Sequence, residues 1–316
     1  LHLSVHSFPT RRSSDLMKFL PFGAIDIGSN AIRLLIMNAI EYPDETKFKK
    51  VSLIRIPLRL GADVFSGQRI SNMKSDQLLH AMTGYRHIMN AYNIIDYRAV
   101  ATSAMREAVN GQELIRKIQH EIGIELEIIN GKQEAEIIFN TGISQYLDTK
   151  KDYIYVDVGG GSTEVTVVSK NKKLEQESFN IGTVRMLTQK EDEAEVQRFK
   201  GFMRQQALRL KDISLIGSGG NINKLFKLMG KKYAESINAD ELKHMYDYLQ
   251  RFTFDERIAV LRLNPHRADV ILPATKIFLR AFKYANSKRI FVPRMGLSDG
   301  IVQQLYQKYK EELVQN

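Results

Sequence analysis

The chain repeats one order of short apolar segments around a glycine turn, and this repetition limits the folds open to it. Residues 22–27 and 32–40 are predicted strands joined by such a turn, and residues 51–58 are a third strand. The same order returns at residues 153–158, 163–169 and 174–179. Amphipathic helical patterns lie between the strands, including one that we expect to begin at Ser75. The pattern therefore predicts an α/β chain built from two related lobes.

We expect the first lobe to cover residues 17–140 and the second to cover residues 141–316, and the last helix is free to pack back on the first lobe. Before Met17, residues 8–16 read Phe-Pro-Thr-Arg-Arg-Ser-Ser-Asp-Leu, which looks like the translation of a sequencing adapter. This segment lacks the apolar run and the small-residue cleavage site of a signal peptide. We therefore interpret residues 1–16 as an artefact outside the fold.

Composition narrows the classes of partner. The 316 residues carry a net charge of +10, which favours anionic partners, although a lysine-rich solvated surface would give the same value. No apolar run reaches the roughly 18 residues of a membrane span, and the aromatic residues form no stacking platform for bases. There is no cysteine, and the histidines lack zinc-site spacing. We expect a cytoplasmic protein that binds neither membrane nor nucleic acid.

The first glycine turn follows Asp26 and contains Gly28, Ser29 and Asn30. Glycine lets backbone N–H groups approach phosphate oxygens, and the two polar side chains add donors. Asp26 is a carboxylate suited to holding Mg²⁺. An ordinary β-hairpin favours the same residue types, so this turn alone leaves both readings open.

The second turn is more specific because it contains three consecutive glycines, which cost conformational entropy and pack poorly in a plain hairpin. The segment runs through Asp157, Gly159, Gly160, Gly161, Ser162, Thr163 and Glu164. Hydroxyls and carboxylates beside bare backbone predict a phosphate cradle next to a metal ligand.

A third turn, with Gly217, Ser218 and Gly219, follows a predicted strand and opens a helix. A helix N-terminus in this position binds anions well. A structural strand-to-helix turn remains the alternative.

Together the three turns resemble those of the actin, Hsp70 and sugar-kinase superfamily. In detail the chain resembles the exopolyphosphatase and guanosine pentaphosphate phosphohydrolase family from about residue 22 to about residue 305. Four motifs carry this resemblance: the turn after Asp26 with Arg33 beyond it, residues 101–108, residues 128–136 and residues 157–164. The resemblance implies an α/β fold of two actin-like (ribonuclease H-like) lobes with a phosphate-binding cleft between them.

The resemblance also implies the roles of individual residues. Glu134 stands where the family has its catalytic base. Mg²⁺ is the implied cofactor, held by Asp157 with Glu164 or Asp26. The implied phosphate-binding residues are Gly28, Ser29, Asn30, Arg33, Arg106, Gly159, Gly160, Gly161, Ser162, Thr163, Gly217, Ser218, Gly219 and Arg267.

The chain departs from the family's pattern at several positions. Gln133 replaces the first Glu of a pair, and Asn130 replaces a Ser. Ser298 replaces an Arg near the C-terminus, and Ala274 and Thr275 replace glycines. The phosphate and metal motifs are kept, while the surrounding positions have changed.

The expected function is release of terminal phosphate from inorganic polyphosphate. Removal of the 5′ γ-phosphate of guanosine pentaphosphate is an equally open alternative, since both substrates end in the same anhydride. A non-catalytic sensor of an alarmone or of polyphosphate is disfavoured because a pure binder has no need of Glu134. A kinase of the same superfamily is disfavoured because Glu134 matches a hydrolase motif. The prediction also allows a homodimer.

Overall fold

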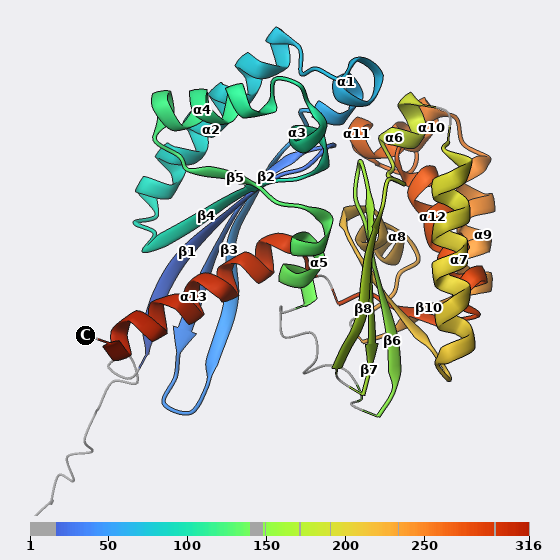
Figure 1. Cartoon of the computed structure of the whole chain (residues 1–316). Coiled ribbons are helices and arrows are strands. Elements are labelled where there is room, and N and C mark those ends of the chain that lie inside the picture. Colours follow the sequence, from blue (N-terminus) through green and yellow to red (C-terminus); the bar gives the residue numbers. More distant parts are fainter. Residues whose placement is uncertain are drawn as a thin grey trace, which may run out of the picture.

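A computed structural model describes residues 17–139, 148, 150–170, 172–189, 191–232, 234–293 and 295–315. The segment interpreted as an artefact and the predicted lobe boundary at residues 140 and 141 lie outside these ranges. Figure 1 shows two α/β lobes side by side, which confirms the architecture predicted from the repeated strands.

Each lobe is organised around one mixed sheet. The strands are β1 (Lys18–Ile27), β2 (Ile32–Glu41), β3 (Thr46–Ile56), β4 (Asp96–Ala101), β5 (Leu126–Ile128), β6 (Asp152–Val158), β7 (Thr163–Ser169), β8 (Lys172–Phe179), β9 (Ser214–Ser218), β10 (Ser236–Asn238) and β11 (Arg289–Phe291). The first sheet has the order β3-β2-β1-β4-β5, and the second has the order β10-β11-β9-β6-β7-β8. Strands β8-β7-β6-β9-β11 repeat the arrangement of the first sheet, so the sequence repeat is also a repeat of topology.

Helices cover these sheets. They are α1 (Leu60–Gly67), α2 (Asn72–Ala91), α3 (Ser103–Glu107), α4 (Gly111–Ile122), α5 (Gly131–Phe139), α6 (Arg185–Thr188), α7 (Glu193–Arg209), α8 (Gly220–Leu228), α9 (Ala239–Gln250), α10 (Phe254–Ala259), α11 (Pro265–Ala268), α12 (Ile271–Ala285) and α13 (Leu297–Gln315). Within the described ranges, no helix is long and apolar enough to cross a membrane.

The start of α2 corrects one prediction. The helix begins at Asn72, and its N-cap is Ser71, whose side chain accepts a hydrogen bond from the Lys74 amide at 3.5 Å. Ser75 lies inside the first turn, where its hydroxyl donates to the Ser71 carbonyl at 2.9 Å. The expected start at Ser75 was wrong because two serines one turn apart both offer the side-chain oxygen that an N-cap needs.

Two apolar layers stabilise the first sheet. Helices α1 to α4 pack on one face, around buried side chains such as Leu78 and Tyr85. The C-terminal helix α13 lies across the other face together with α5 (Figure 1). The Tyr306 ring stands edge-on to Phe22 at 6.3 Å and to Phe48 at 5.5 Å between ring centroids. The end of the chain therefore belongs to the core of the first lobe.

The lobes meet around the glycine turns. The Asn30 side chain donates to the His266 carbonyl at 3.2 Å, and Arg59 forms an ion pair with Asp269 at 2.5 Å. The second lobe has its own core beneath α7, α8, α9 and α12. These polar contacts lie beside the cleft described next, and Val184 and Val270 of the second lobe also pack into the apolar core of the first.

Candidate active site

A cavity of about 310 Å³ lies between the lobes and is lined by residues of both. Its wall includes all three glycine turns and the start of α13. The predicted site residues found on this wall are Asp26, Gly28, Ser29, Asn30, Arg33, Glu134, Asp157, Gly159, Gly160, Ser162, Ser218, Gly219 and Arg267. Segments far apart in the sequence therefore meet in one cleft.

The first two turns have the same backbone form. The Gly28 amide donates to the Ala31 carbonyl at 3.1 Å, and the Gly159 amide donates to the Ser162 carbonyl at 3.0 Å. The two turns also touch, because a Cβ on Gly160 would lie 2.9 Å from the Cβ of Ser29. Glycine is needed here for close approach of two backbones, which explains part of the triglycine sequence.

The third turn requires glycine for a different reason. Gly219 has φ of +102°, a conformation that side-chain-bearing residues rarely adopt. A Cβ there would lie 3.2 Å from Asp157 Oδ1. This turn therefore packs directly against the carboxylate that ends β6.

Five predicted residues lie behind the cleft wall. Gly161 packs against Ser103 of the first lobe, and Gly217 packs against Ile290. The Thr163 hydroxyl donates to the Ile181 carbonyl, and Arg106 donates to the Ile129 carbonyl at 2.8 Å. The fifth, Glu164, belongs to a group of carboxylates.

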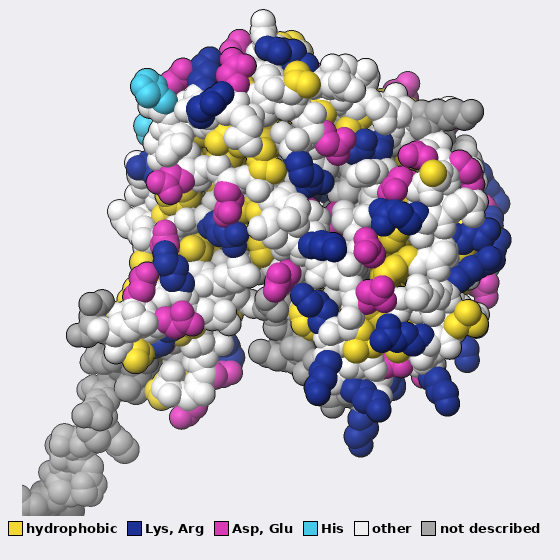
Figure 2. Space-filling view, in the orientation of Figure 1, with side chains coloured by type: hydrophobic (Ala, Val, Ile, Leu, Met, Phe, Trp, Pro, Cys, Tyr) yellow, Lys and Arg dark blue, Asp and Glu magenta, His cyan; other side chains and the backbone are white. Residues whose placement is uncertain are grey.

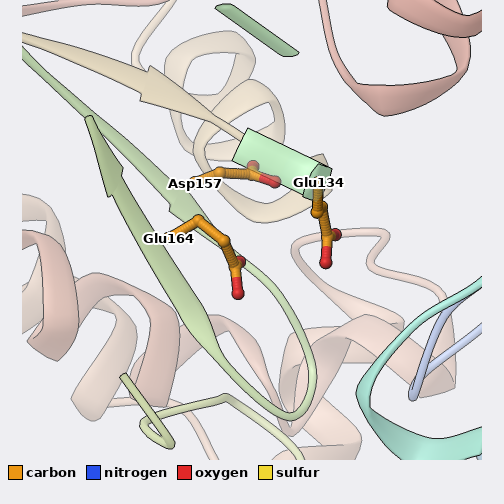
Figure 3. A group of neighbouring side chains, drawn as sticks. All are labelled: Glu134, Asp157 and Glu164. Atoms are coloured by element: carbon orange, nitrogen blue, oxygen red, sulfur yellow. The ribbon is translucent and has the colours of Figure 1, made fainter. Parts of the chain in front are cut away.

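Three carboxyl groups gather at one point. Glu134, Asp157 and Glu164 each offer an oxygen, and these oxygens lie within 4.8 Å of one another. Figure 3 shows the three side chains converging from α5 and from neighbouring strands β6 and β7. Asp157 and Glu164 are direct partners in the antiparallel ladder, so their side chains share one face of the sheet.

Local hydrogen bonds fix this group. The hydroxyls of Ser162 and Ser178 donate to Glu164 Oε1 at 2.6 and 3.0 Å. At the start of α5, Asn130 and Gln133 each accept a hydrogen bond from the other's backbone amide, at 2.8 and 2.9 Å. This reciprocal arrangement is a capping box, and it places Glu134 in the first turn of the helix. The two departures from the family's pattern therefore build a cap beside Glu134.

Burial and mutual repulsion change how these carboxyls titrate. Burial, and then the charges of Glu164 and Asp157, raise the pKa of Glu134 well above its usual value. Burial raises the pKa of Asp157 to about 6, although the nearby Ser218 hydroxyl and the charge of Arg33 oppose this rise. Burial and the charge of Asp157 raise the pKa of Glu164 to about 7. Neighbouring carboxylates need a counter-charge before all of them can ionise.

The group fits a divalent cation. Asp157 Oδ1 is buried and has no hydrogen-bond partner among the described residues, so it is available as a ligand. Carboxylate oxygens are the ligands that Mg²⁺ prefers. Asp26, the other predicted ligand, lies apart from this group and pairs with Arg33 at 2.6 Å.

Two rows of side chains occupy equivalent places in the two sheets. Asp26, Arg33 and Arg55 are successive ladder partners across β1, β2 and β3, and we call them the first-lobe row. Their counterparts on β6, β7 and β8 are Asp157, Glu164 and Ser178, the second-lobe row. The first row carries two arginines where the second carries Glu164 and Ser178. The repeat has therefore diverged into a cationic side and an acidic side.

Comparison with known proteins identifies the relatives of this chain. A sequence model of the Ppx/GppA phosphatase family matches residues 40–309. The chain belongs to this family. Ppx/GppA membership agrees with the resemblance drawn from the glycine turns and from the segment around Glu134.

Three relatives show the range of the family. The chain is 30% identical over 293 residues to a bifunctional 3-dehydroquinate synthase/phosphatase of Fusobacterium nucleatum, covering 85% of this chain and 44% of that protein. It is 24% identical over 302 residues to a guanosine-5′-triphosphate,3′-diphosphate pyrophosphatase of Photobacterium profundum, covering 92% and 60%. It is 28% identical over 273 residues to exopolyphosphatase 2 of Mycobacterium tuberculosis, covering 78% and 85%. The chain thus spans about half the length of the first two Ppx/GppA relatives.

A solved Ppx/GppA structure supports the same fold. The crystal structure of the Aquifex aeolicus family member superposes with a TM-score of 0.73 at 25% identity, covering 92% of this chain and 99% of that one. The two-lobed fold is therefore shared along almost the whole chain.

The raised pKa values predict how stability depends on pH. Carboxyls whose pKa is higher in the folded than in the unfolded protein favour the protonated folded state, and this stabilisation is lost as pH rises through about 6 to 7. We therefore expect the Tm in EDTA to fall between pH 5 and pH 8. Mg²⁺ should raise Tm more at pH 8 than at pH 5, because protons compete for the same oxygens. Calorimetric melts would check this, and an equal Mg²⁺ effect at both pH values would contradict it.

Proposed function

We propose that this Ppx/GppA chain releases the terminal phosphate of inorganic polyphosphate through attack of water at the chain end. One observation carries the proposal. Asp157 and the buried Glu134 each place a carboxyl oxygen within 4.8 Å of the other, and Arg33 and Arg267 line the same cleft. Phosphoryl transfer depends mainly on such positioning and on neutralising charge.

Each group has a definite task in this reaction. The backbone amides of the glycine turns, with Arg33 and Arg267, bind the oxygens of the terminal phosphate. Glu134 accepts the proton of the attacking water, and its place in the first turn of α5 holds its carboxyl group beside Asp157. When bound by Asp157 and Glu164, Mg²⁺ would offset the negative charge of the phosphate oxygens.

Guanosine pentaphosphate is the second candidate substrate. Leu53, Met295 and Leu297 line the same cleft, and Leu53 is more than half exposed. These side chains offer an apolar surface on which a nucleoside can pack. The Photobacterium relative is named for a guanosine substrate, whereas the Mycobacterium relative is named for polyphosphate.

Phosphate release from both substrates tests the proposal. The protein would be incubated with Mg²⁺ and either long-chain polyphosphate or guanosine pentaphosphate, and orthophosphate would be measured over time. We expect release from polyphosphate, and the ratio of the two kcat/KM values ranks the candidates. No release from either substrate would contradict the hydrolase and favour a binding protein.

A further prediction concerns salt. Arg33, Arg55 and Arg267 line the cleft, and further Lys and Arg side chains gather on the second lobe at the ends of β6, β7 and β8 away from the glycine turn (Figure 2). Raising ionic strength from about 0.1 M to 1 M shortens the Debye length from about 10 Å to 3 Å. We expect KM for polyphosphate to rise over this range while kcat changes little. A KM that is independent of salt would mean that the protein binds polyphosphate by shape complementarity instead of charge.

Location and assembly stay predictions. We propose the cytoplasm, on the basis of the chain's lack of cysteine. A homodimer is proposed on the family resemblance alone.

A further inference from the structure

Arg55, like Arg267, is a cation of the cleft with no ion-pair partner among the described residues. It lines the cavity from β3, and within the described residues no hydrogen bond or ion pair involves its guanidinium. Its Nε is buried and lacks a partner. The other arginine of the first-lobe row, Arg33, pairs with Asp26, and Arg59 pairs with Asp269. A half-buried guanidinium without a partner destabilises the folded protein unless a ligand supplies the missing hydrogen bonds.

A β-bulge turns Arg55 toward the cleft. Strand β3 pairs Lys50 with Met37 but Ser52 with Ile36, so Val51 is an extra residue. Beyond the bulge, Arg55 pairs with Arg33 and shares its face of the sheet. The second lobe has a bulge at the equivalent place, between Val167 and Val168. The bulge is therefore a feature of the repeat. In each lobe it determines which side chain of the third strand shares a face with the rest of the row.

Other cations surround Arg55. Burial, and then the charges of Arg33 and Arg267, lower the pKa of Arg55 to about 10. The guanidiniums of Arg267 and Arg33 lie 3.2 and 3.8 Å from the position that a Gly220 Cβ would take. The single nearby carboxylate of the row, Asp26, already pairs with Arg33. Of the three arginines Arg33, Arg55 and Arg267, only Arg33 therefore has an ion-pair partner among the described residues.

We propose that Arg55 binds the phosphate group next to the one that is removed. This inference rests on the proposed function. It also gives the substrate a direction: the terminal phosphate lies at Glu134 and Asp157, and the remaining chain runs along β3.

The continuation of β3 supports this direction. Lys50 lies five residues before Arg55 and also lines the cleft, where its ammonium pairs with Asp299 at 2.7 Å. Because Val51 is an extra residue, four ladder steps of about 3.3 Å separate Lys50 from Arg55, so Lys50 stands roughly 13 Å further out. Leu53 lies between the two cations on the same wall. The wall therefore offers cations at both ends of a path that leaves the catalytic carboxylates.

Binding of pyrophosphate in EDTA tests Arg55 without relying on turnover. Isothermal calorimetry would compare the wild type, Arg55→Gln, Arg55→Lys and the control Arg116→Gln, which removes an exposed arginine of α4. We expect Arg55→Gln to weaken binding roughly 10- to 100-fold, the effect of losing hydrogen bonds between charged groups. The affinity of Arg55→Lys should lie between those of the wild type and Arg55→Gln. Lysine keeps the charge but cannot make the paired hydrogen bonds of a guanidinium. Arg116→Gln should match the wild type.

A second readout shows that each variant is folded. Removing a cation from a like-charged cluster should raise the Tm of the anion-free protein by about 1–3 °C in Arg55→Gln. Absence of pyrophosphate binding in the wild type, or binding by Arg55→Gln within about twofold of wild type, would overturn the inference. Failure of the proposed function is a separate result, because it appears as absent phosphate release whatever the calorimetry gives.

Discussion

Replacing Glu134 with Gln is expected to lower kcat for phosphate release by at least about 100-fold while KM changes little. The amide keeps the size of the side chain but cannot accept the proton of the attacking water. Because Glu134 is buried among carboxylates, the change also removes a repulsive charge, so the variant should fold at least as well as the wild type. Steady-state kinetics with polyphosphate, together with a thermal melt, measure both effects.

The matched control lies on the same helix. Glu136 is exposed and is 3.9 Å from Lys173, so Glu136→Gln removes a carboxylate from α5 without touching the cleft. It should keep activity close to that of the wild type. Comparable losses in both variants would assign the effect to the helix, and wild-type activity in Glu134→Gln would remove the proposed base.

Replacing Asp157 with Asn is expected to abolish the stabilisation by Mg²⁺ and to lower activity by about 100-fold or more, since the charge contributed by a bound metal is worth several kcal/mol. Within the carboxylate group, Asp157 has a buried oxygen without a hydrogen-bond partner, and the amide leaves the site without that anionic ligand. The Tm difference between Mg²⁺ and EDTA reports metal binding independently of turnover.

Asp152 supplies the control for this experiment. It begins β6, where it accepts a hydrogen bond from the Lys211 amide at 3.2 Å, and Asn can accept the same bond. Asp152→Asn should keep both the Mg²⁺ effect and the activity. An Asp157→Asn variant that Mg²⁺ still stabilises to the full extent would show that the cation lies elsewhere.

The sequence predicted the parts of the cleft that depend on local pattern. Glycine turns after apolar strands are visible in the order of residues, and their repetition indicated two lobes. The ladder partner of Asp26 was also within reach, because counting back from the tight turn after β1 places Arg33 opposite it. The Asp26 carboxylate already has a cationic partner in Arg33, and this pairing counts against the expectation that Asp26 holds the metal.

Arg55 was missed because its direction depends on an irregularity in the ladder. Counting from Glu41 opposite Thr46 would pair Arg33 with Ile54 and turn Arg55 to the other face. The bulge shifts the register by one residue and returns Arg55 to the face of Arg33. No residue preference within residues 49–53 predicts this bulge. The contact of Lys50 with Asp299 was equally hidden, because it joins an edge strand to a helix almost 250 residues later.

In the proposed reaction, water activated at Glu134 attacks the terminal phosphorus. Hydrolysis of tripolyphosphate or guanosine pentaphosphate in ¹⁸O-labelled water with Mg²⁺ tests this most directly, with mass spectrometry of both products. We expect the label to appear in the released orthophosphate and not in the shortened chain, and we expect Glu134→Gln to suppress its appearance. Label in the shortened chain, or labelled orthophosphate formed at the wild-type rate by Glu134→Gln, would contradict it.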